Sequence, residues 1–323
     1  MTPENPKDLS VVIPSFDEEE NIKLLYPKLK SVLEGLKKNY EIIFVDDGST
    51  DQTYDFLRKI CKDDENVKAV VFRRNFGQSA AISAGFDYAR GDIIVTLDAD
   101  LQNDPEDIPR LLEKINQGFD VVSGWRVNRK DPFLTRRLPS YISNWLISLF
   151  TGVKLHDHGC SLKAYKKEVA KEIKLYGEMH RFIPALASWV GASICEVKVR
   201  HHPREYGKSK YGFSRINRGF LDLLTVKFLL SFATRPIQIF GKFGLISVFL
   251  GFVCGIVLIV MKFIHGVDMT GNPFLYLSIL FLLIGGQFIS IGLLGEIISR
   301  IYHESQNKSI YSVKEVLGYK KDG

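Results

Sequence analysis

The amino-acid sequence predicts an α/β fold with a mostly parallel sheet, helices on both faces, and membrane-associated helices after it. Three observations support this prediction. Short β-branched runs alternate with segments of helical spacing as far as Gly124. Acidic motifs directly follow several of these runs, and charged residues become rare in the last third of the chain. We therefore expect a soluble domain first and a membrane region second.

Five apolar runs in the first part are expected to be strands: Leu9–Pro14, Glu41–Val45, Val67–Phe72, Asp92–Leu97 and Asp120–Gly124. Helical patterns lie between them. The first helix has apolar residues three or four positions apart from Ile22 to Leu36, and later ones cover Ser79–Ala89 and Pro105–Gln117. Ser193–Arg200 is expected to be a further short strand. Alternating strands and helices favour a parallel sheet, in which ligands bind at the carboxyl ends of the strands.

Composition narrows the range of partners. The net charge of +6 is modest, and no nucleic-acid-binding motif accompanies it. The excess of basic residues suits phosphates or anionic lipid headgroups, so we expect a membrane partner and no nucleic acid. The scattered cysteines form no CxxC pair, which argues against a zinc centre or a disulfide framework. They are Cys61, Cys160, Cys195 and Cys254.

Two uncharged stretches, Phe243–Met261 and Met269–Gly295, are long enough to cross a bilayer and would form a hairpin. Basic residues flank its outer ends, at Arg235, Lys242, Arg300 and Lys308. The positive-inside rule then assigns the soluble domain and the C-terminus to the cytoplasm. The segment Phe220–Thr234 is too short and too charged to span. It is either a helix lying in the membrane interface or a buried helix of the soluble domain.

These observations give four predicted regions. A cytoplasmic domain covers 1–212, interfacial amphipathic helices cover 213–242, two transmembrane helices cover 243–298, and a cytoplasmic tail covers 299–323. Small residues in the predicted spans allow close helix packing and a homo-oligomer.

The strongest chemical signal is Asp98-Ala-Asp100, which directly follows an apolar run. Two carboxylates at the end of a strand can hold a hard cation that also binds phosphate oxygens, and oxygen ligands favour Mg²⁺ or Mn²⁺. The alternative is that these aspartates form a turn and cap the next helix. The motif Asp46-Asp47-Gly-Ser49 also follows a predicted strand. Its carboxylates suit a nucleoside, while Ser49 or Asp51 can cap the following helix.

Together these motifs resemble glycosyltransferase family 2. Val12-Ile-Pro-Ser-Phe-Asp-Glu18 is similar to the opening motif of that family, and the two acidic motifs resemble its nucleotide and metal motifs. Arg73-Arg-Asn-Phe-Gly77 resembles the dolichol-phosphate mannose synthase branch. The two C-terminal spans resemble its bacterial members that load sugars onto polyprenyl phosphate. The resemblance implies a GT-A type, Rossmann-like fold.

The resemblance also implies roles for particular residues. The donor would be bound by Pro14, Glu18, Asp46, Asp47, Arg204 and Lys210. The metal and the pyrophosphate would be held by Asp98, Asp100 and Gln102. The acceptor phosphate would be bound by Arg126, Arg137 and Ser140. Catalytic roles would fall to Asp98, Asp100 and Asp157, with a structural or sugar-binding role for Asp157 left open.

Physical chemistry supports a basic set of this kind. The reaction brings a lipid phosphate to a nucleotide diphosphate, so several negative charges share one pocket, and arginine binds phosphate bidentately. Each arginine alone is better explained as a solvated surface residue. The phosphate explanation is better for the set.

The predicted activity is a metal-dependent hexosyltransferase reaction at the inner membrane, for cell-envelope glycosylation. It would transfer a sugar, with glucose from UDP-glucose as the first candidate, to undecaprenyl phosphate with inversion. Three alternatives are open: a dolichol-phosphate-mannose-type synthase that uses GDP-mannose, a polysaccharide synthase with a saccharide acceptor, and a non-catalytic sugar-sensing scaffold. The sequence lacks the Gln-x-x-Arg-Trp motif and the extra spans typical of polysaccharide synthases.

Overall fold

The structure is a computed structural model. It describes residues 7–127, 144, 147–149, 151–175, 179–203, 237–266, 268–305 and 310–319. The chain divides into two compact units. The first contains Met1–Val226 and Ser309–Gly323, and the second is Lys227–Lys308.

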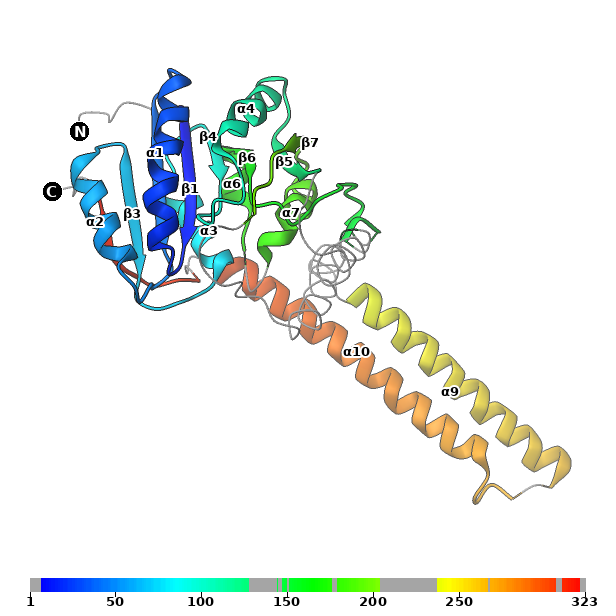
Figure 1. Cartoon of the computed structure of the whole chain (residues 1–323). Coiled ribbons are helices and arrows are strands. Elements are labelled where there is room, and N and C mark those ends of the chain that lie inside the picture. Colours follow the sequence, from blue (N-terminus) through cyan, green and yellow to red (C-terminus); the bar gives the residue numbers. More distant parts are fainter. Residues whose placement is uncertain are drawn as a thin grey trace. The chain divides into compact units, whose positions relative to one another are not determined.

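The described part of the first unit alternates strands and helices along the chain (Figure 1). Its first half contains β1 (Leu9–Ser15), α1 (Glu19–Gly35), β2 (Tyr40–Asp46), α2 (Thr53–Asp63), β3 (Val67–Phe72), α3 (Gln78–Tyr88), β4 (Ile93–Thr96), the 3-10 helix η1 (Pro105–Asp107), α4 (Ile108–Asn116) and β5 (Val121–Arg126). Its second half contains β6 (Lys163–Lys166), α6 (Lys167–Glu172), the 3-10 helix η3 (Met179–Phe182), α7 (Ile183–Trp189), β7 (Ile194–Val199) and β8 (Val313–Leu317).

The strands of the described residues form one sheet in the order β7-β5-β6-β4-β1-β2-β3-β8. The central strands β4, β1, β2 and β3 are parallel, as are β5 and β7. The predicted α/β class with a mostly parallel sheet is therefore confirmed, and each of the six predicted strands is present. The sequence did not predict β6, which inserts antiparallel between β4 and β5.

Helices cover both faces of the sheet because successive strand residues point to opposite sides. On one face Leu9, Val11 and Ile13 of β1 join a buried cluster, which includes leucines of α1, α2 and α4. On the other face Val12 meets α3 so closely that a Cβ on Gly85 would lie 2.0 Å from its side chain. The core thus lies in two layers, and the loops at the strand ends remain free to carry chemistry.

The C-terminal region differs from the predicted tail. Helix α10 of the second unit continues to Ser305, and after it β8 pairs antiparallel with β3 at the edge of the sheet. A strand of five residues with charged positions carries little periodic signal, and its partner is far away in sequence. The segment 299–323 therefore includes a structural strand of the first unit.

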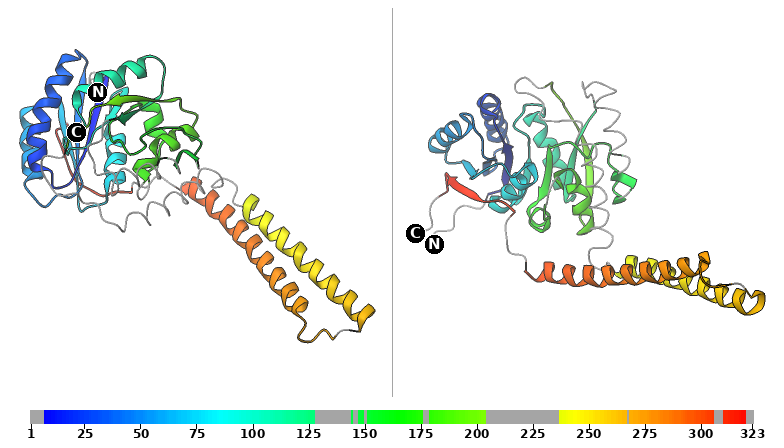
Figure 2. Two further views of the ribbon diagram at one scale, coloured as in Figure 1. Left: turned by 45° about the vertical axis from the view of Figure 1, so that its right-hand side comes forward. Right: turned by 90° about the horizontal axis from the view of Figure 1, so that it is seen from below.

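The described part of the second unit contains two helices, α9 (Ile237–His265) and α10 (Pro273–Ser305), that lie side by side as a hairpin (Figure 2). Each contains a stretch long and apolar enough to cross a membrane, Phe240–His265 and Pro273–Gly295. Both helices extend beyond the predicted 243–298 region. Most of the predicted interfacial region 213–242, with its segment Phe220–Thr234, lies outside the described residues.

Small residues let the two helices approach closely. A Cβ on Gly244 would lie 2.9 Å from the carbonyl oxygen of Gly285, so neither position tolerates a larger side chain without a shift. The Ser247 hydroxyl donates to the carbonyl of Phe281 at 2.8 Å across the same contact. Backbone contact and hydrogen bonds of this kind stabilise helix pairs in lipid, where burial of apolar surface does not.

Candidate active site

The predicted motifs meet at the carboxyl ends of the parallel strands. In the register of β1 and β2, Ser15 lies opposite Asp46, and the backbone N–H of Asp47 donates to the carbonyl of Ser15 at 2.8 Å. The strand β4 lies on the other side of β1, and Leu97 donates to Val12 at 3.0 Å. The three loops after these strands are therefore neighbours.

The loop after β1 and the loop after β2 hold each other in place. The backbone N–H of Thr50 donates to Asp17 Oδ1 at 2.7 Å, and the N–H of Asp17 donates to Ser49 Oγ at 3.0 Å. The N–H of Glu18 donates to Thr53 Oγ1 at 3.0 Å. Ser49 is thus used between the loops and does not cap α2. This contact network positions the predicted donor residues Pro14 and Glu18 beside the Asp46 motif.

Asp46 is buried at the end of β2, and its Oδ1 accepts from the N–H of Ser49 at 3.0 Å. Burial raises the pKa of Asp46. Asp47, which follows it, binds the backbone of the loop 73–77, which follows β3, with both oxygens. It accepts from the N–H of Phe76 at 2.7 Å and from that of Gly77 at 2.9 Å. Asp47 therefore fixes the loop 73–77 to the end of β2.

Gly48 allows this approach. Its φ of +74° lies in the left-handed region, and a Cβ there would lie 2.5 Å from the backbone carbon of Arg74. The Asp-Gly part of the Asp46-Asp47-Gly48 motif therefore has a structural role that the sequence alone did not reveal.

The acidic pair of the third motif follows β4. Asp98 is partly buried, and its Oδ1 accepts a hydrogen bond from Gln78 Nε2 at 2.8 Å. Asp100 is buried, and its Oδ1 accepts from the N–H of Gln102 at 3.2 Å. Leu101, directly after Asp100, has a φ of +60°, a conformation that costs energy for a leucine and is found at functional sites. The capping role considered from the sequence belongs instead to Asp104, which accepts from the N–H of Glu106.

The electrostatics of this pair suit a cation. Burial, followed by the neighbouring charge of Asp100, raises the pKa of Asp98 to about 6. A divalent cation between two such carboxylates would relieve their repulsion. Within the part of the chain that the structure describes, no group of three or more His, Cys, Asp or Glu gathers as a metal cage. The donor set thus fits Mg²⁺ or Mn²⁺ that takes further ligands from substrate oxygens and water.

Four predicted residues lie outside the described residues: Arg137, Ser140, Arg204 and Lys210. The chain that leads to Arg204 is described as far as Pro203. There His202 donates its backbone N–H to the carbonyl of Gln102 at 2.9 Å, and His201 forms a bridge with Asn103. The segment before Arg204 therefore lies directly beside the predicted metal motif.

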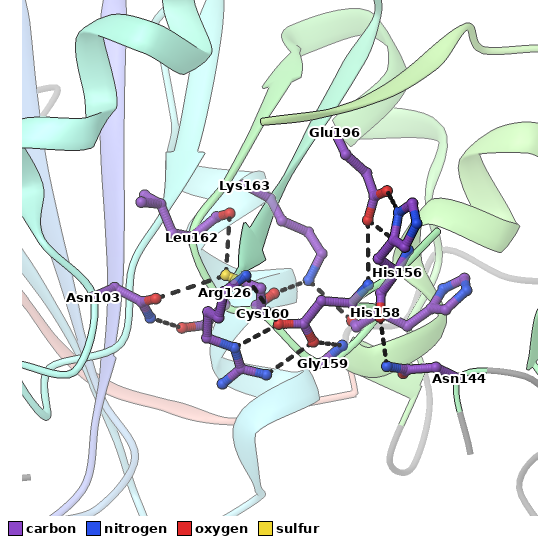
Figure 3. A network of polar contacts seen from close by, with 12 residues as sticks. Asn103, Arg126, Asn144, His156, His158, Gly159, Cys160, Leu162, Lys163 and Glu196 are labelled. Carbon is purple, nitrogen blue, oxygen red and sulfur yellow. Dashed lines mark hydrogen bonds and ion pairs between the residues drawn. The ribbon is translucent and has the colours of Figure 1, made fainter. Parts of the chain in front are cut away.

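Arg126 ends β5 and forms a bidentate ion pair with Asp157 (Figure 3). Its Nε lies 2.6 Å from Oδ2, and its Nη2 lies 2.9 Å from Oδ1. The N–H of Gly159 also donates to Asp157, at 3.1 Å. The side chain of Arg126 is 13% exposed and that of Asp157 is 4% exposed. The two predicted residues are therefore brought together, and the carboxylate holds the guanidinium in one orientation.

Lys163 is a buried cation that the sequence analysis did not assign to the site. Its Nζ donates to the carbonyls of His158 and Cys160, which shapes the loop that carries Asp157 (Figure 3). Asn103 donates to Ser161 Oγ at 2.7 Å and fixes the same loop to the segment after the acidic pair. The charges of Lys163 and Arg126 both act on Asp98. One basic network thus supports the acidic pair.

Sequence reasoning also missed Gln78. A signal was present, because Gln78 directly follows the Arg73–Gly77 motif at the start of a helix whose neighbours are small and apolar. No such signal marked Lys163, which begins the four-residue strand Lys-Ala-Tyr-Lys. His156, next to Asp157, pairs with Glu196 at 2.8 Å and stacks on Trp125.

Comparisons with known proteins show the family of this chain. Residues 10–174 match the model of glycosyl transferase family 2. A dodecaprenyl-phosphate galacturonate synthase from Rhizobium johnstonii is 43% identical over 316 residues, covering 96% of this chain and 93% of the relative. An undecaprenyl-phosphate 4-deoxy-4-formamido-L-arabinose transferase from Photorhabdus laumondii is 39% identical over 320 residues, covering 98% and 97%.

A solved structure supports the fold. Glucosyl-3-phosphoglycerate synthase from Mycobacterium tuberculosis, crystallised with Mn²⁺, UDP and its product, superposes with a TM-score of 0.53 at 19% identity. The match covers 68% of this chain and 80% of that one. At this identity the likeness establishes the shared fold.

Proposed function

Because this chain belongs to glycosyl transferase family 2, we propose that it transfers a sugar from a nucleotide-sugar to a polyprenyl phosphate with inversion. The observation that carries this proposal is the acidic pair Asp98 and Asp100 beside the partly buried Arg126 and the buried Lys163. An acidic pair suits a metal-bound diphosphate, and a nearby arginine suits a second phosphate. The names of both curated relatives state a polyprenyl phosphate product or acceptor.

On the donor side, Asp98 and Asp100 would hold Mg²⁺ or Mn²⁺, with Gln102 beside them. When bound, the cation supplies charge neutralisation for the leaving diphosphate. Asp46 would accept hydrogen bonds from the nucleoside, next to Pro14 and Glu18. Gln78 keeps one oxygen of Asp98 fixed, so that the carboxylate has a single orientation toward its ligand.

On the acceptor side, the lipid phosphate needs no strong general base. Its second pKa is about 6, so an oxygen is already ionised near neutral pH. Arg126 would orient this phosphate for direct displacement at the anomeric carbon. Both oxygens of Asp157 are occupied by Arg126 and Gly159, which favours a positioning role for Asp157 over proton transfer. Arg137, Ser140, Arg204 and Lys210 remain proposed phosphate and donor contacts.

The sugar is proposed to be UDP-linked. Glucose is the first candidate from the sequence, but the relative with 43% identity is named for galacturonate. UDP-galacturonate is therefore the first donor to test, followed by UDP-glucose and a UDP-linked 4-formamido sugar.

We further propose that α9 and α10 span the inner membrane, with the catalytic unit on the cytoplasmic side and the predicted homo-oligomer assembled in the bilayer.

The experiment is a matrix of donors and acceptors. Membranes containing the full chain are incubated with each labelled donor, GDP-mannose included, and with undecaprenyl phosphate, undecaprenol or a saccharide. The proposal expects label in the lipid fraction only with undecaprenyl phosphate, and the opposite anomeric configuration in the product. Label in a polymer would favour the saccharide-acceptor alternative. If none of the donors supported any transfer, the result would favour the non-catalytic scaffold.

A further inference from the structure

The C-terminal segment 310–319, which follows the membrane hairpin in the chain, lies along β3 at the edge of the sheet. In the pairing of β3 with β8, Phe72 lies opposite Val313 and Ala69 lies opposite Leu317. The N–H of Arg73 donates to the carbonyl of Ser312 at 3.1 Å, one step beyond the strand. The segment therefore runs antiparallel to β3, and its beginning lies next to the loop 73–77.

Two tyrosines anchor this segment at opposite ends of β3. Tyr311 stacks on Phe72, with ring centroids 5.0 Å apart and planes 17° apart, and its hydroxyl donates to Asp87 at 2.9 Å. Tyr319 donates to the carbonyl of Tyr88 at 3.2 Å and lies under Lys68 Nζ, 4.6 Å from the ring centroid. Tyr311 is at the carboxyl end of β3, which faces the site. Tyr319 is at the amino end.

The contacts of Tyr311 continue to the acidic motifs. Phe72 packs edge to face against Phe76, at 5.7 Å and 87°. The N–H of Phe76 donates to Asp47, as described above, and the chain then reaches Gln78, which holds Asp98. An unbroken series of contacts thus joins Tyr311, through two phenylalanines, to both acidic motifs. Within the described residues, the contacts of Tyr319 run to Lys68, Tyr88 and Arg90 and not to the acidic motifs.

We propose that Tyr311 is a positioning residue for donor binding: its ring holds Phe72 and Phe76 so that the loop 73–77 presents Asp47 and Gln78 correctly. The expected effect on donor kinetics rests on the proposed function. The expected effect on the order of the loop 73–77 does not. Because α10 ends at Ser305, only a short connection separates the proposed membrane hairpin from a residue that organises the donor site.

The test compares Tyr311→Ala with Tyr311→Phe and with the matched control Tyr319→Ala, all in the full-length protein in detergent or nanodiscs. Tyr311→Phe keeps the ring that stacks on Phe72 and removes the hydroxyl that donates to Asp87. Tyr319→Ala removes an aromatic anchor of the same segment away from the site. Transfer kinetics with the donor selected above are measured together with the affinity for UDP in the presence of Mn²⁺.

We expect Tyr311→Ala to lower kcat/KM for the donor about five- to tenfold, the loss of roughly one aromatic pair, with the KM for the lipid acceptor unchanged. Tyr311→Phe should restore donor kinetics close to the wild type, and Tyr319→Ala should reduce thermal stability without changing the donor KM. Equal kinetic effects of Tyr311→Ala and Tyr319→Ala, or an unchanged donor kcat/KM in Tyr311→Ala, would overturn the proposal.

Hydrogen exchange separates this inference from the proposed function. Even if no donor supports transfer to lipid, Tyr311→Ala should speed amide exchange in residues 73–77, while Tyr319→Ala should leave this loop protected. If both variants leave the loop equally protected, or both expose it equally, Tyr311 has no particular positioning role.

Discussion

At the scale of single residues, the acidic pair depends on neighbours that hold it. Asp98 receives a hydrogen bond from Gln78, and Asp100 receives one from the backbone after it. A carboxylate that is free to rotate would need to be ordered when a cation and a diphosphate bind. Fixing it beforehand reduces that cost in the transition state.

Replacement of Gln78 tests this positioning. Gln78→Met keeps the length of the side chain and removes the hydrogen bond, so we expect kcat/KM for the donor to fall about tenfold, as for the loss of about 1.5 kcal/mol. Gln78→Glu should be worse, because a second carboxylate would face Asp98. Steady-state transfer assays measure both. Full activity in Gln78→Met, or an advantage of Gln78→Glu, contradicts the assignment.

His158 gives a prediction for pH. Burial, and then the charge of Lys163, lowers the pKa of His158 to about 4 from its ordinary 6.5. Between these two pH values the unfolded chain binds a proton at His158 that the folded chain does not. The free energy of unfolding therefore falls as the pH falls from 6.5 to 4, by up to about 1.4 kcal/mol per pH unit. Thermal unfolding from pH 7 to 5 should show a smaller loss in His158→Gln than in the wild type. Parallel curves would show that His158 does not contribute.

The acidic motifs could be predicted as site residues because each follows an apolar run, and parallel strands end at one edge. Their partners could not be predicted in the same way. Gln78 and Asp98 are in different motifs, and the pairing of Arg126 with Asp157 crosses a stretch without regular periodicity. Only the folded arrangement shows that these pairs are in contact.

At the scale of elements, the end of β2 and the loop 73–77 form one unit. Asp47 binds the loop through two backbone groups, and Gly48 lies against Arg74. The loop in turn leads into α3, whose first residue reaches Asp98. The motif proposed to bind the donor and the motif proposed to bind the metal are thus connected through one short segment.

Gly48→Ala tests this connection. An alanine with positive φ costs about 1 kcal/mol, and its Cβ would overlap the backbone of Arg74, so the total loss of stability should be about 1–3 kcal/mol. We expect weaker nucleotide binding in the same variant, measured by calorimetry. Gly118, which also has positive φ but has nothing within 4 Å of a Cβ, offers the matched control Gly118→Ala. Identical nucleotide affinity in both variants would contradict the role of the loop.

The sequence could predict the strands that alternate with helices, because a buried parallel strand is a continuous apolar run. It could not predict β6 and β8. Both are short, carry lysines, and pair antiparallel with strands far away in the sequence. The positions of β6 and β8 depend on the gap or edge of the sheet with which they pair, and no local sequence pattern predicts these positions.

At the scale of the whole molecule, the chain leaves the first unit, forms the apolar hairpin α9–α10, and returns to the same sheet through β8. A membrane-spanning hairpin with this connectivity must have both outer ends on one side. The basic residues at those ends favour the cytoplasmic side.

Reporter fusions test this topology. Green fluorescent protein at the C-terminus should fluoresce in a bacterial host, and alkaline phosphatase at the same place should be inactive. Alkaline phosphatase inserted after Gly271, in the turn between α9 and α10, should be active. The reverse pattern would place the catalytic unit on the other side of the membrane, and activity at neither place would mean that the hairpin does not span it.

The most direct test of the account is the binding of Mn²⁺ measured by electron paramagnetic resonance, with and without UDP, in the wild type, Asp98→Asn and Asp100→Asn. The account predicts nucleotide-dependent binding of Mn²⁺ to the wild type and its loss in both variants, with transfer reduced at least about a hundredfold. Folding is checked by thermal unfolding. Unchanged Mn²⁺ binding in both folded variants, or full transfer in excess chelator, would contradict the claim that this acidic pair holds the catalytic cation.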